Sequence, residues 1–255
     1  MNYLKKYLQS NNQVHRVIKD VFHSKPVLID HLAHRTFNIT NIYKDYSKYK
    51  YQLQDKMYHF HEHNAIAEWW KCGSDNFNNS YTNELYKYNN KIRGTPRIFL
   101  SRYNGVKRDK NFYGTDIDLN LVQWHIDNPS AQMSYHLYEQ LTCHNQYLAW
   151  TLLHRESVNH IGIAVDNIET IAEEVEKIYP LNNPDAPIQV SEDGDLLQFS
   201  TTSMMKPYEF TEGTREVPYN FLEFIERKNN REGFSTKNAN IVLNSTTTQI
   251  VSSYD

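Results

Sequence analysis

The chain has 255 residues, of which 39% are hydrophobic and 13% aromatic, enough to form the core of one large domain or two small ones. Its formal net charge of −3, with basic residues scattered along the chain, excludes the basic footprint of a nucleic-acid-binding protein. The sequence has no run of about 18 apolar residues that would predict a membrane span, and its polar first residues lack the apolar segment of a signal peptide. We therefore expect a soluble cytoplasmic protein with neither nucleic acid nor membrane as a partner.

Apolar spacing in the first half of the chain predicts helices on both sides of a small set of strands. In chain order, we predict one or two helices within 3–23, a strand at 27–37, a helical stretch at 64–70, a strand at 97–103, a loop-rich region at 105–130 and a helix at 131–153. Pro26 ends the first helical region, because proline lacks the backbone donor that a helix needs.

The second half follows the order strand, helix, strand, strand. Its predicted elements are a strand at 158–165, a helix at 167–179 with Asp166 as N-cap, a loop at 180–187, a strand at 196–201, a loop at 207–218 and a strand at 219–227. The first half can be read in a similar order, although the matching segments, 30–33 and 159–162, are too short to prove a repeat.

This organisation predicts an α+β protein whose residues 1–255 form a single domain made of two modules. The N-terminal module spans about 24–125, with residues 1–23 as a helical extension, and the C-terminal module spans about 155–255. The helix at 131–153 lies between them. Two modules of this kind would each bend a small sheet around a shared cavity.

Three of the predicted strands each carry one side chain that can bind a metal, namely His31, His160 and Glu223. Two histidines and one carboxylate form the facial set that holds non-haem iron(II) and leaves positions open for substrate and dioxygen, whereas zinc more often closes a tetrahedron. Side chains two residues apart share a face of a strand, so His160 shares its face with the small Gly162 and Ala164, which leave room for a metal. Taken singly, each histidine could instead be a hydrogen-bonded core residue, and Glu223 a solvated edge residue.

Arg35 lies four residues after His31 on the same strand face, at most about 13 Å away along the strand. Its guanidinium could bind a carboxylate through two hydrogen bonds, and the alternative is a surface salt bridge. A substrate that chelates the metal at one end and meets Arg35 at the other would be a short dicarboxylic 2-oxo acid. Gln198 and Ser200 share a face of their strand and are candidate substrate contacts, with packing or a sheet-edge position as the alternative.

A second histidine group competes for the role of metal site. His59, His61 and His63 alternate along the chain and would share one face of a strand, but they would scatter around a helix. We favour the interpretation that these three are ordinary histidines.

Five short motifs occur in an order and spacing that resemble those of one enzyme family. They are DHLAHRTF at 30–37, PRIFLS at 96–101, VNHI at 158–161, LQFST at 197–201 and FLEFIER at 221–227. A closing segment, EGFS at 232–235 followed by NAN at 238–240, fits the same pattern. On these motifs the chain resembles the 2-oxoadipate dioxygenase/decarboxylase family over nearly its whole length.

The resemblance implies the vicinal oxygen chelate fold, in which two βαβββ-type modules form a curved mixed sheet around a metal site, here with added helices. It implies iron(II), Fe(2+), as cofactor, and 2-oxoadipate and dioxygen as the small molecules that react to 2-hydroxyglutarate and carbon dioxide. By position it assigns the metal to His31, His160 and Glu223, and the substrate carboxylate to Arg35, whose catalytic role would be to orient the substrate. A glyoxalase-like metal-dependent isomerase or lyase on the same fold, and a non-catalytic homologue, are the alternative functions.

Overall fold

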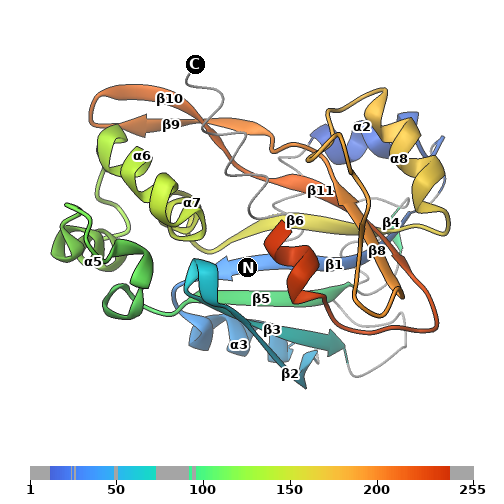
Figure 1. The fold of residues 1–255 in the computed structure, drawn as a ribbon, viewed down its shortest axis with the longest axis horizontal. Helices are drawn as coiled ribbons and strands as arrows, with labels where there is room; N and C mark the ends of the chain where they lie inside the picture. Colours follow the sequence, from blue (N-terminus) through green and yellow to red (C-terminus); the bar gives the residue numbers. More distant parts are fainter. Residues whose placement is uncertain are drawn as a thin grey trace.

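A curved mixed sheet of nine strands is the framework of the computed structural model, which describes residues 12–23, 25, 27–48, 51–72, 92–93 and 96–241 (Figure 1). The strands of this sheet are β1 (Val27–Thr36), β2 (Tyr51–Phe60), β3 (Ala65–Cys72), β4 (Ile92–Arg93), β5 (Arg97–Tyr103), β6 (Ser157–Ala164), β7 (Gln189–Val190), β8 (Leu196–Ser200) and β11 (Phe221–Arg227). Outside it, β9 (Met205–Phe210) and β10 (Gly213–Pro218) pair with each other as a two-stranded sheet.

The order of the strands is symmetric about the centre of the sheet. It runs β2-β3-β5-β1-β6-β11-β8-β7, with β4 paired to β1. The central strands β1 and β6 are antiparallel to each other, and each has a parallel neighbour, β5 and β11 respectively. Each half of the chain runs strand, helix, three strands, if β4 and the β9–β10 hairpin are left aside. The helix of the first half is α3 (Ile39–Lys48), and the helix of the second half is α8 (Ile168–Glu176). This confirms the predicted α+β fold, while the module boundaries stay a prediction.

The prediction of a helical stretch at 64–70 is wrong, because this segment forms strand β3. The strand pairs with β2 on one side and with β5 on the other. Ala65, Ala67 and Trp69 pack together into one core cluster, which is the period of a strand and not of a helix. A short apolar run of this kind cannot be assigned by periodicity alone, and here the pairing partners on both sides decide its conformation.

The helices between the two halves also differ from the prediction. An unpredicted helix, α5 (Leu119–Asp127), begins where the Asp118 side chain accepts hydrogen bonds from two backbone amides of its first turn. The predicted helix at 131–153 is two helices, α6 (Tyr135–His144) and α7 (Gln146–His154). Asn145 separates them, because its backbone is extended (φ −154°) and its side chain caps the start of α7.

Further corrections concern the second half. The N-cap of α8 is Asn167 and not Asp166, since the Asn167 side chain accepts a hydrogen bond from the amide of Thr170. The predicted loop at 207–218 contains most of the β9–β10 hairpin. The remaining helical elements are α2 (Asn12–Asp20), the 3-10 helices η1 (His61–His63), η2 (Val106–Arg108) and η3 (Lys110–Phe112), and a helix that begins at 236 and reaches the last described residue, 241. The first eleven residues of the predicted N-terminal extension lie outside the described residues.

Each face of the sheet carries its own hydrophobic core cluster. One cluster includes Leu32, Ile161 and Leu222 and packs against α2, α3 and α8. The other includes Ala33 and Phe99 and packs against α6 and α7, and the candidate metal ligands lie on this side. Strand parity therefore places the ligands as predicted, opposite the larger aliphatic residues of their own strands. None of the helices in the described part of the chain is long and apolar enough to cross a membrane.

Candidate metal centre

Three adjacent strands bring His31, His160 and Glu223 together. Gly162 of β6 pairs with His31 of β1 on one side and with Glu223 of β11 on the other, and His160 lies two residues before it on the same face. The Nε2 atoms of the two histidines are 3.2 Å apart. Oε2 of Glu223 lies 3.2 Å from Nε2 of His31 and 3.5 Å from Nε2 of His160. These distances fit one ion, because bonds of about 2.0–2.2 Å at angles of about 90–110° put neighbouring ligand atoms about 2.8–3.6 Å apart.

Gly162 provides the room for this arrangement. A Cβ atom at Gly162 would lie 2.3 Å from Nδ1 of His31 and 2.4 Å from its Cε1. The imidazole of His31 therefore lies directly over the backbone of β6, where only glycine leaves space. The His31 ring therefore explains why a residue as small as Gly162 stands two positions after His160.

Irregularities in β1 and β6 orient both imidazoles. The pairing register of these strands shifts between Ile29 and His31, and again between Ala33 and His34, so that Asp30 and Asn159 each stand as an extra, unpaired residue. Each of these two residues directly precedes a ligand histidine, and its side chain reaches the ring of that histidine. Oδ1 of Asp30 lies 3.0 Å from Nδ1 of His31, and Oδ1 of Asn159 lies 3.1 Å from Nδ1 of His160.

These contacts define what the centre can bind. Acceptors at both Nδ1 atoms hold the ring protons there, so each Nε2 presents a lone pair toward the common point. Glu223 is 1% exposed, and its Oε2 has no hydrogen-bond donor among the described residues. Three electron-pair donors thus meet in a buried space, and a metal cation between them would satisfy all three. In the described part of the chain, this is the one group of three such side chains whose ligand atoms gather within 4.8 Å.

The charges around the centre favour a cation. Burial opposes ionisation of Asp30, but hydrogen bonds from Arg227 and His31 outweigh it and hold the pKa of that carboxyl well below its usual range. Burial likewise lowers the pKa of His31, but Asp30 and Glu223 outweigh burial and the pKa is raised. Burial, together with the charges of His31 and Arg35, holds the pKa of His160 well below its usual value. Positive charge is therefore stabilised at the His31 side of the centre, while His160 stays neutral.

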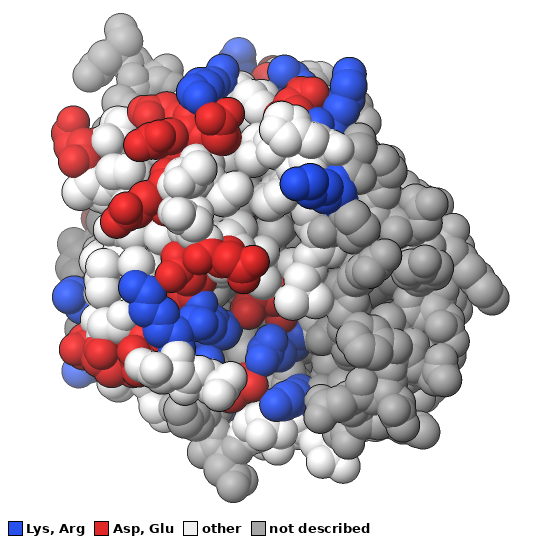
Figure 2. Space-filling model, turned by 90° about the vertical axis from the view of Figure 1, so that its right-hand side faces the viewer, with Lys and Arg blue, Asp and Glu red and all other residues white. Residues whose placement is uncertain are grey.

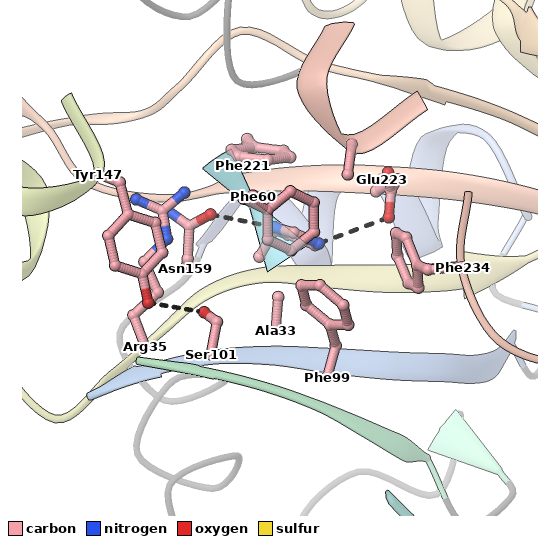
Figure 3. Close-up of a pocket in the computed structure, with 12 residues that line it drawn as sticks. Ala33, Arg35, Phe60, Phe99, Ser101, Tyr147, Asn159, Phe221, Glu223 and Phe234 are labelled. Carbon is pink, nitrogen blue, oxygen red and sulfur yellow. Dashed lines mark hydrogen bonds and ion pairs between the residues drawn. The ribbon is translucent and has the colours of Figure 1, made fainter. Parts of the chain in front are cut away.

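Beside the centre lies a cavity with about 480 Å³ of empty space when the part open to solvent is included. Figure 3 shows Phe60, Phe99, Phe221 and Phe234 around it, with Glu223 at one end of the view and Arg35 at the other. The Phe221 ring stacks on the ring of His160, with their centroids 4.6 Å apart. The cavity therefore offers apolar walls between a metal-binding end and a cationic end.

Arg35 supplies the positive charge at the far end. The residue is 7% exposed, and its guanidinium carbon lies 4.6 Å from the ring centre of Tyr147 and 4.9 Å from that of Trp150. Burial lowers the pKa of Arg35 to about 10, which still leaves the group charged at neutral pH. Among the described residues it has neither a carboxylate partner nor a hydrogen-bond acceptor, so the predicted alternative of a surface salt bridge does not apply. A buried guanidinium without a counter-ion calls for an anion from outside the chain.

The other candidate residues lie outside the cavity. Gln198 is fully buried, and its Nε2 donates to Oε1 of Glu223 at 2.8 Å. Ser200 accepts a hydrogen bond from the Asn182 side chain at 3.3 Å. Neither residue lines the cavity. Gln198 instead contacts the candidate ligand Glu223, and a substrate contact for either residue stays a prediction.

The histidine group at 59–63 does not converge on a common point. The rings of His59 and His61 stack at 5.8 Å, whereas His63 is buried apart from them. Sequence reasoning missed Asp30, Asn159 and Tyr147 as parts of the site. A signal for the first two was present, because each stands immediately before one of the two ligand histidines.

Comparison with known proteins identifies the family and supports the fold. The model of the 2-oxoadipate dioxygenase/decarboxylase family matches residues 100–236, more than half of the chain. These residues include His160 and Glu223, whereas His31 and Arg35 precede them. The chloroplastic 2-oxoadipate dioxygenase/decarboxylase of Arabidopsis thaliana is 28% identical over 162 residues, which are 54% of this chain and 42% of that protein. The match thus spans less than half of the plant relative.

Two solved structures extend the comparison of the fold. Hydroxyglutarate synthase from Oryza sativa, crystallised with 2-oxoadipate, aligns with a TM-score of 0.77 and 21% identity over 98% of this chain and 91% of that one. A putative glyoxalase superfamily protein from Ralstonia eutropha JMP134 aligns with a TM-score of 0.56 and 17% identity over 82% of this chain and 75% of that one. Together with the extent of the family match, the observed fold leads to one conclusion. The chain belongs to the 2-oxoadipate dioxygenase/decarboxylase family.

Proposed function

We propose that this protein is a non-haem iron(II) dioxygenase/decarboxylase that acts on a 2-oxo dicarboxylic acid, with 2-oxoadipate as the favoured substrate and 2-hydroxyglutarate and carbon dioxide as products. One observation carries the proposal. A single cavity is lined by His160 and Glu223 of the ligand set, and it has Glu223 at one end and the unpaired guanidinium of Arg35 at the other. A 2-oxo dicarboxylic acid is complementary to both ends, because its 2-oxo acid group chelates metals and its distal carboxylate pairs with arginine.

The proposed reaction balances with dioxygen as its one co-substrate. The bond between the carboxyl carbon and the keto carbon breaks, and the carboxyl carbon leaves as carbon dioxide. One oxygen atom of dioxygen enters the new carboxylate at the former keto carbon, and the other becomes the hydroxyl group on the adjacent carbon. Oxidative decarboxylation and C–H hydroxylation each release two electrons, and these four electrons reduce dioxygen completely. No separate reductant is needed.

The chain's own residues would divide the work between metal binding and substrate orientation. Iron(II) held by His31, His160 and Glu223 would supply the Lewis-acid and redox chemistry on which the 2-oxo acid and dioxygen react. Arg35 would bind the distal carboxylate and thereby fix which end of the substrate faces the ligands. Gln198 would hold the Glu223 carboxylate in orientation through its hydrogen bond.

The four phenylalanines that line the cavity would keep water from the reacting groups. An apolar wall also strengthens the electrostatic attraction between Arg35 and a carboxylate, because no solvent screens the pair. The alternative function, a glyoxalase-like isomerase or lyase, would use the same ligands without consuming dioxygen. The unpaired Arg35 favours the dicarboxylic substrate over the small neutral or monoanionic substrates that such an enzyme could accept equally well.

The test starts from anaerobically purified protein loaded with iron(II). 2-Oxoadipate is added under air, and dioxygen uptake, carbon dioxide and 2-hydroxyglutarate are measured in the same sample. We expect equal amounts of all three. 2-Oxohexanoate, which has the same number of carbon atoms but no distal carboxylate, is the matched control and should react poorly. No dioxygen uptake with any five- or six-carbon 2-oxo acid would reject the dioxygenase, and turnover without dioxygen would support the isomerase or lyase.

A further inference from the structure

After β11 the chain reverses and returns to the metal centre through residues 228–235, here called the strap. Asn229 and Asn230 both have positive φ values, 51° and 53°, and Gly233 has φ 78°. Asparagine and glycine tolerate this left-handed conformation best among the amino acids, so the local sequence suits a sharp reversal. The turn carries Phe234 back over the ligands, where its ring centre lies 4.8 Å from that of His31 and its side chain lines the cavity.

Arg227, the last residue of β11, holds the strap and the metal centre with one guanidinium group. Its Nε and Nη2 atoms donate to the two oxygens of Asp30 at 2.7 and 2.9 Å. Its Nη1 atom donates to the backbone carbonyls of Gly233 at 2.8 Å and Arg231 at 3.3 Å. Because the guanidinium is rigid and planar, it cannot turn toward one set of acceptors without leaving the other.

Asp30 completes the path from the strap to the ligand. The residue is 2% exposed, and the same carboxylate that accepts from Arg227 contacts Nδ1 of His31 at 3.0 Å. Trp69 forms a parallel route, since its ring packs against Phe234, His31 and the guanidinium of Arg227. A carboxylate that contacts the far nitrogen of a metal-bound histidine fixes the orientation of its ring, and mutation of such partners commonly weakens metal binding 10- to 100-fold.

The strap also has an attachment that does not involve Asp30. Arg231 donates to Asp193 at 3.0 Å, and Asn229 donates to Asp195 at 2.9 Å, so the loop between β7 and β8 holds the strap from outside. The strap turns at the right-hand side of Figure 1, and Figure 2, which looks onto that side, shows acidic and basic side chains intermixed there. Arg97 is a further link, since it donates to Glu232 of the strap at 2.8 and 2.9 Å and lies 3.6 Å from Asp30. The contacts of Arg227 and the outer attachment to Asp193 and Asp195 can be weakened separately.

We propose that Arg227 is a positioning residue that couples closure of the strap to the geometry of His31, so that metal binding and strap closure stabilise each other. The proposal rests on the proposed metal centre but not on its reaction. Coupling of this kind is reciprocal: if the closed strap raises metal affinity by some factor, bound metal must suppress strap opening by the same factor.

Hydrogen–deuterium exchange of the peptide that spans 228–241 measures strap opening in the full chain, with and without saturating cobalt(II). In the wild-type protein we expect cobalt(II) to slow exchange at least about fivefold, the lower end of typical coupling. Arg227→Lys keeps the charge but cannot hold both sets of acceptors, so cobalt(II) should slow exchange of the strap by a smaller factor than in the wild-type protein. Its cobalt(II) affinity should fall about 10- to 100-fold, with a change in the visible spectrum of the bound ion.

Arg231→Lys is the matched control, because it makes the same exchange four residues away and loosens the strap without touching Asp30. Exchange should become faster in this variant, but cobalt(II) should slow it by the wild-type factor. Asp30→Asn breaks the path from its other end, so at saturating cobalt(II) this variant should also lose part of its metal-dependent protection.

Two results would overturn the proposal: cobalt(II) does not slow exchange in the wild-type strap, or it slows exchange equally in Arg227→Lys. A wild-type protein that consumes dioxygen with 2-oxoadipate and yet shows no such protection would retain the proposed function and lose this inference. A wild-type protein that binds no divalent metal would lose both.

Discussion

Gly162→Ala tests the geometry of the metal centre with one methyl group. The added Cβ would lie 2.3 Å from Nδ1 of His31, whereas ordinary van der Waals contact begins at 3.4 Å. The His31 ring must therefore move by about 1.1 Å, the difference between the two distances, or the backbone of β6 must shift by a comparable amount. Metal sites tolerate errors of only about 0.2 Å in ligand distance, so His31 can no longer share an ion with His160 and Glu223.

The expected effect is much larger on metal binding than on folding. Overpacking of a core commonly costs about 1–3 kcal/mol of stability, which a domain of this size survives. Loss of one ligand from a set of three should weaken metal binding by at least about 100-fold, since repositioning even an outer partner costs about 10- to 100-fold. Cobalt(II) titration by calorimetry measures the affinity, and chemical denaturation of the metal-free protein measures the stability.

Ile163→Val on the same strand is the control for Gly162→Ala. Ile163 faces the opposite core cluster, and the substitution should cost about 0.5–1.5 kcal/mol without changing cobalt(II) affinity. If Gly162→Ala binds cobalt(II) as tightly as the wild-type protein, the ligand arrangement described above is refuted.

Three further predictions concern other residues of the site and core. Arg35→Met should lower kcat/KM for 2-oxoadipate roughly 100-fold or more and remove the preference over 2-oxohexanoate, because hydrogen bonds to charged groups contribute about 1.5–3 kcal/mol each; a preserved preference would contradict the assigned role. Gln198→Leu removes the donor to Glu223 and should weaken cobalt(II) binding about 10- to 100-fold, and an unchanged affinity would leave Gln198 as a packing residue. Burial lowers the pKa of His34 from 6.5 to about 3. As the pH falls below 6.5, the unfolded chain therefore binds a proton at this histidine that the folded protein does not bind, and the free energy of unfolding decreases. Between pH 7 and 5.5 this histidine should account for about 1.2 kcal/mol of lost stability, which denaturation of His34→Gln at both pH values should recover; equal losses in the two proteins would contradict it.

The common face of the candidate ligands was predictable from the sequence because strand parity is a local property. His160, Gly162 and Glu223 lie in short apolar runs, and a period of two places each side chain on one face without knowledge of the partner strands. The bulge residues Asp30 and Asn159 escape this reasoning, since a bulge locally breaks the alternation on which it depends.

Features that depend on distant partners were not predictable. Arg227 and Asp30 are 197 positions apart, and nothing local to either residue indicates that they meet. The sequence of strand β3 predicts a helix for the same reason, because its conformation is decided by β2 and β5. Asn145 ends α6 and caps α7 within an otherwise helical apolar pattern, where a single polar residue gives a weak signal.

Isotope labelling of the oxygen atoms distinguishes the proposed dioxygenase reaction from every reaction that does not use dioxygen. The iron(II)-loaded protein is supplied with 2-oxoadipate and ¹⁸O₂ in unlabelled water, and the products are analysed by mass spectrometry. We expect 2-hydroxyglutarate with one labelled oxygen in the carboxylate formed at the former keto carbon and one in its hydroxyl group, and unlabelled carbon dioxide. Product formed without any label from dioxygen would contradict the proposed reaction.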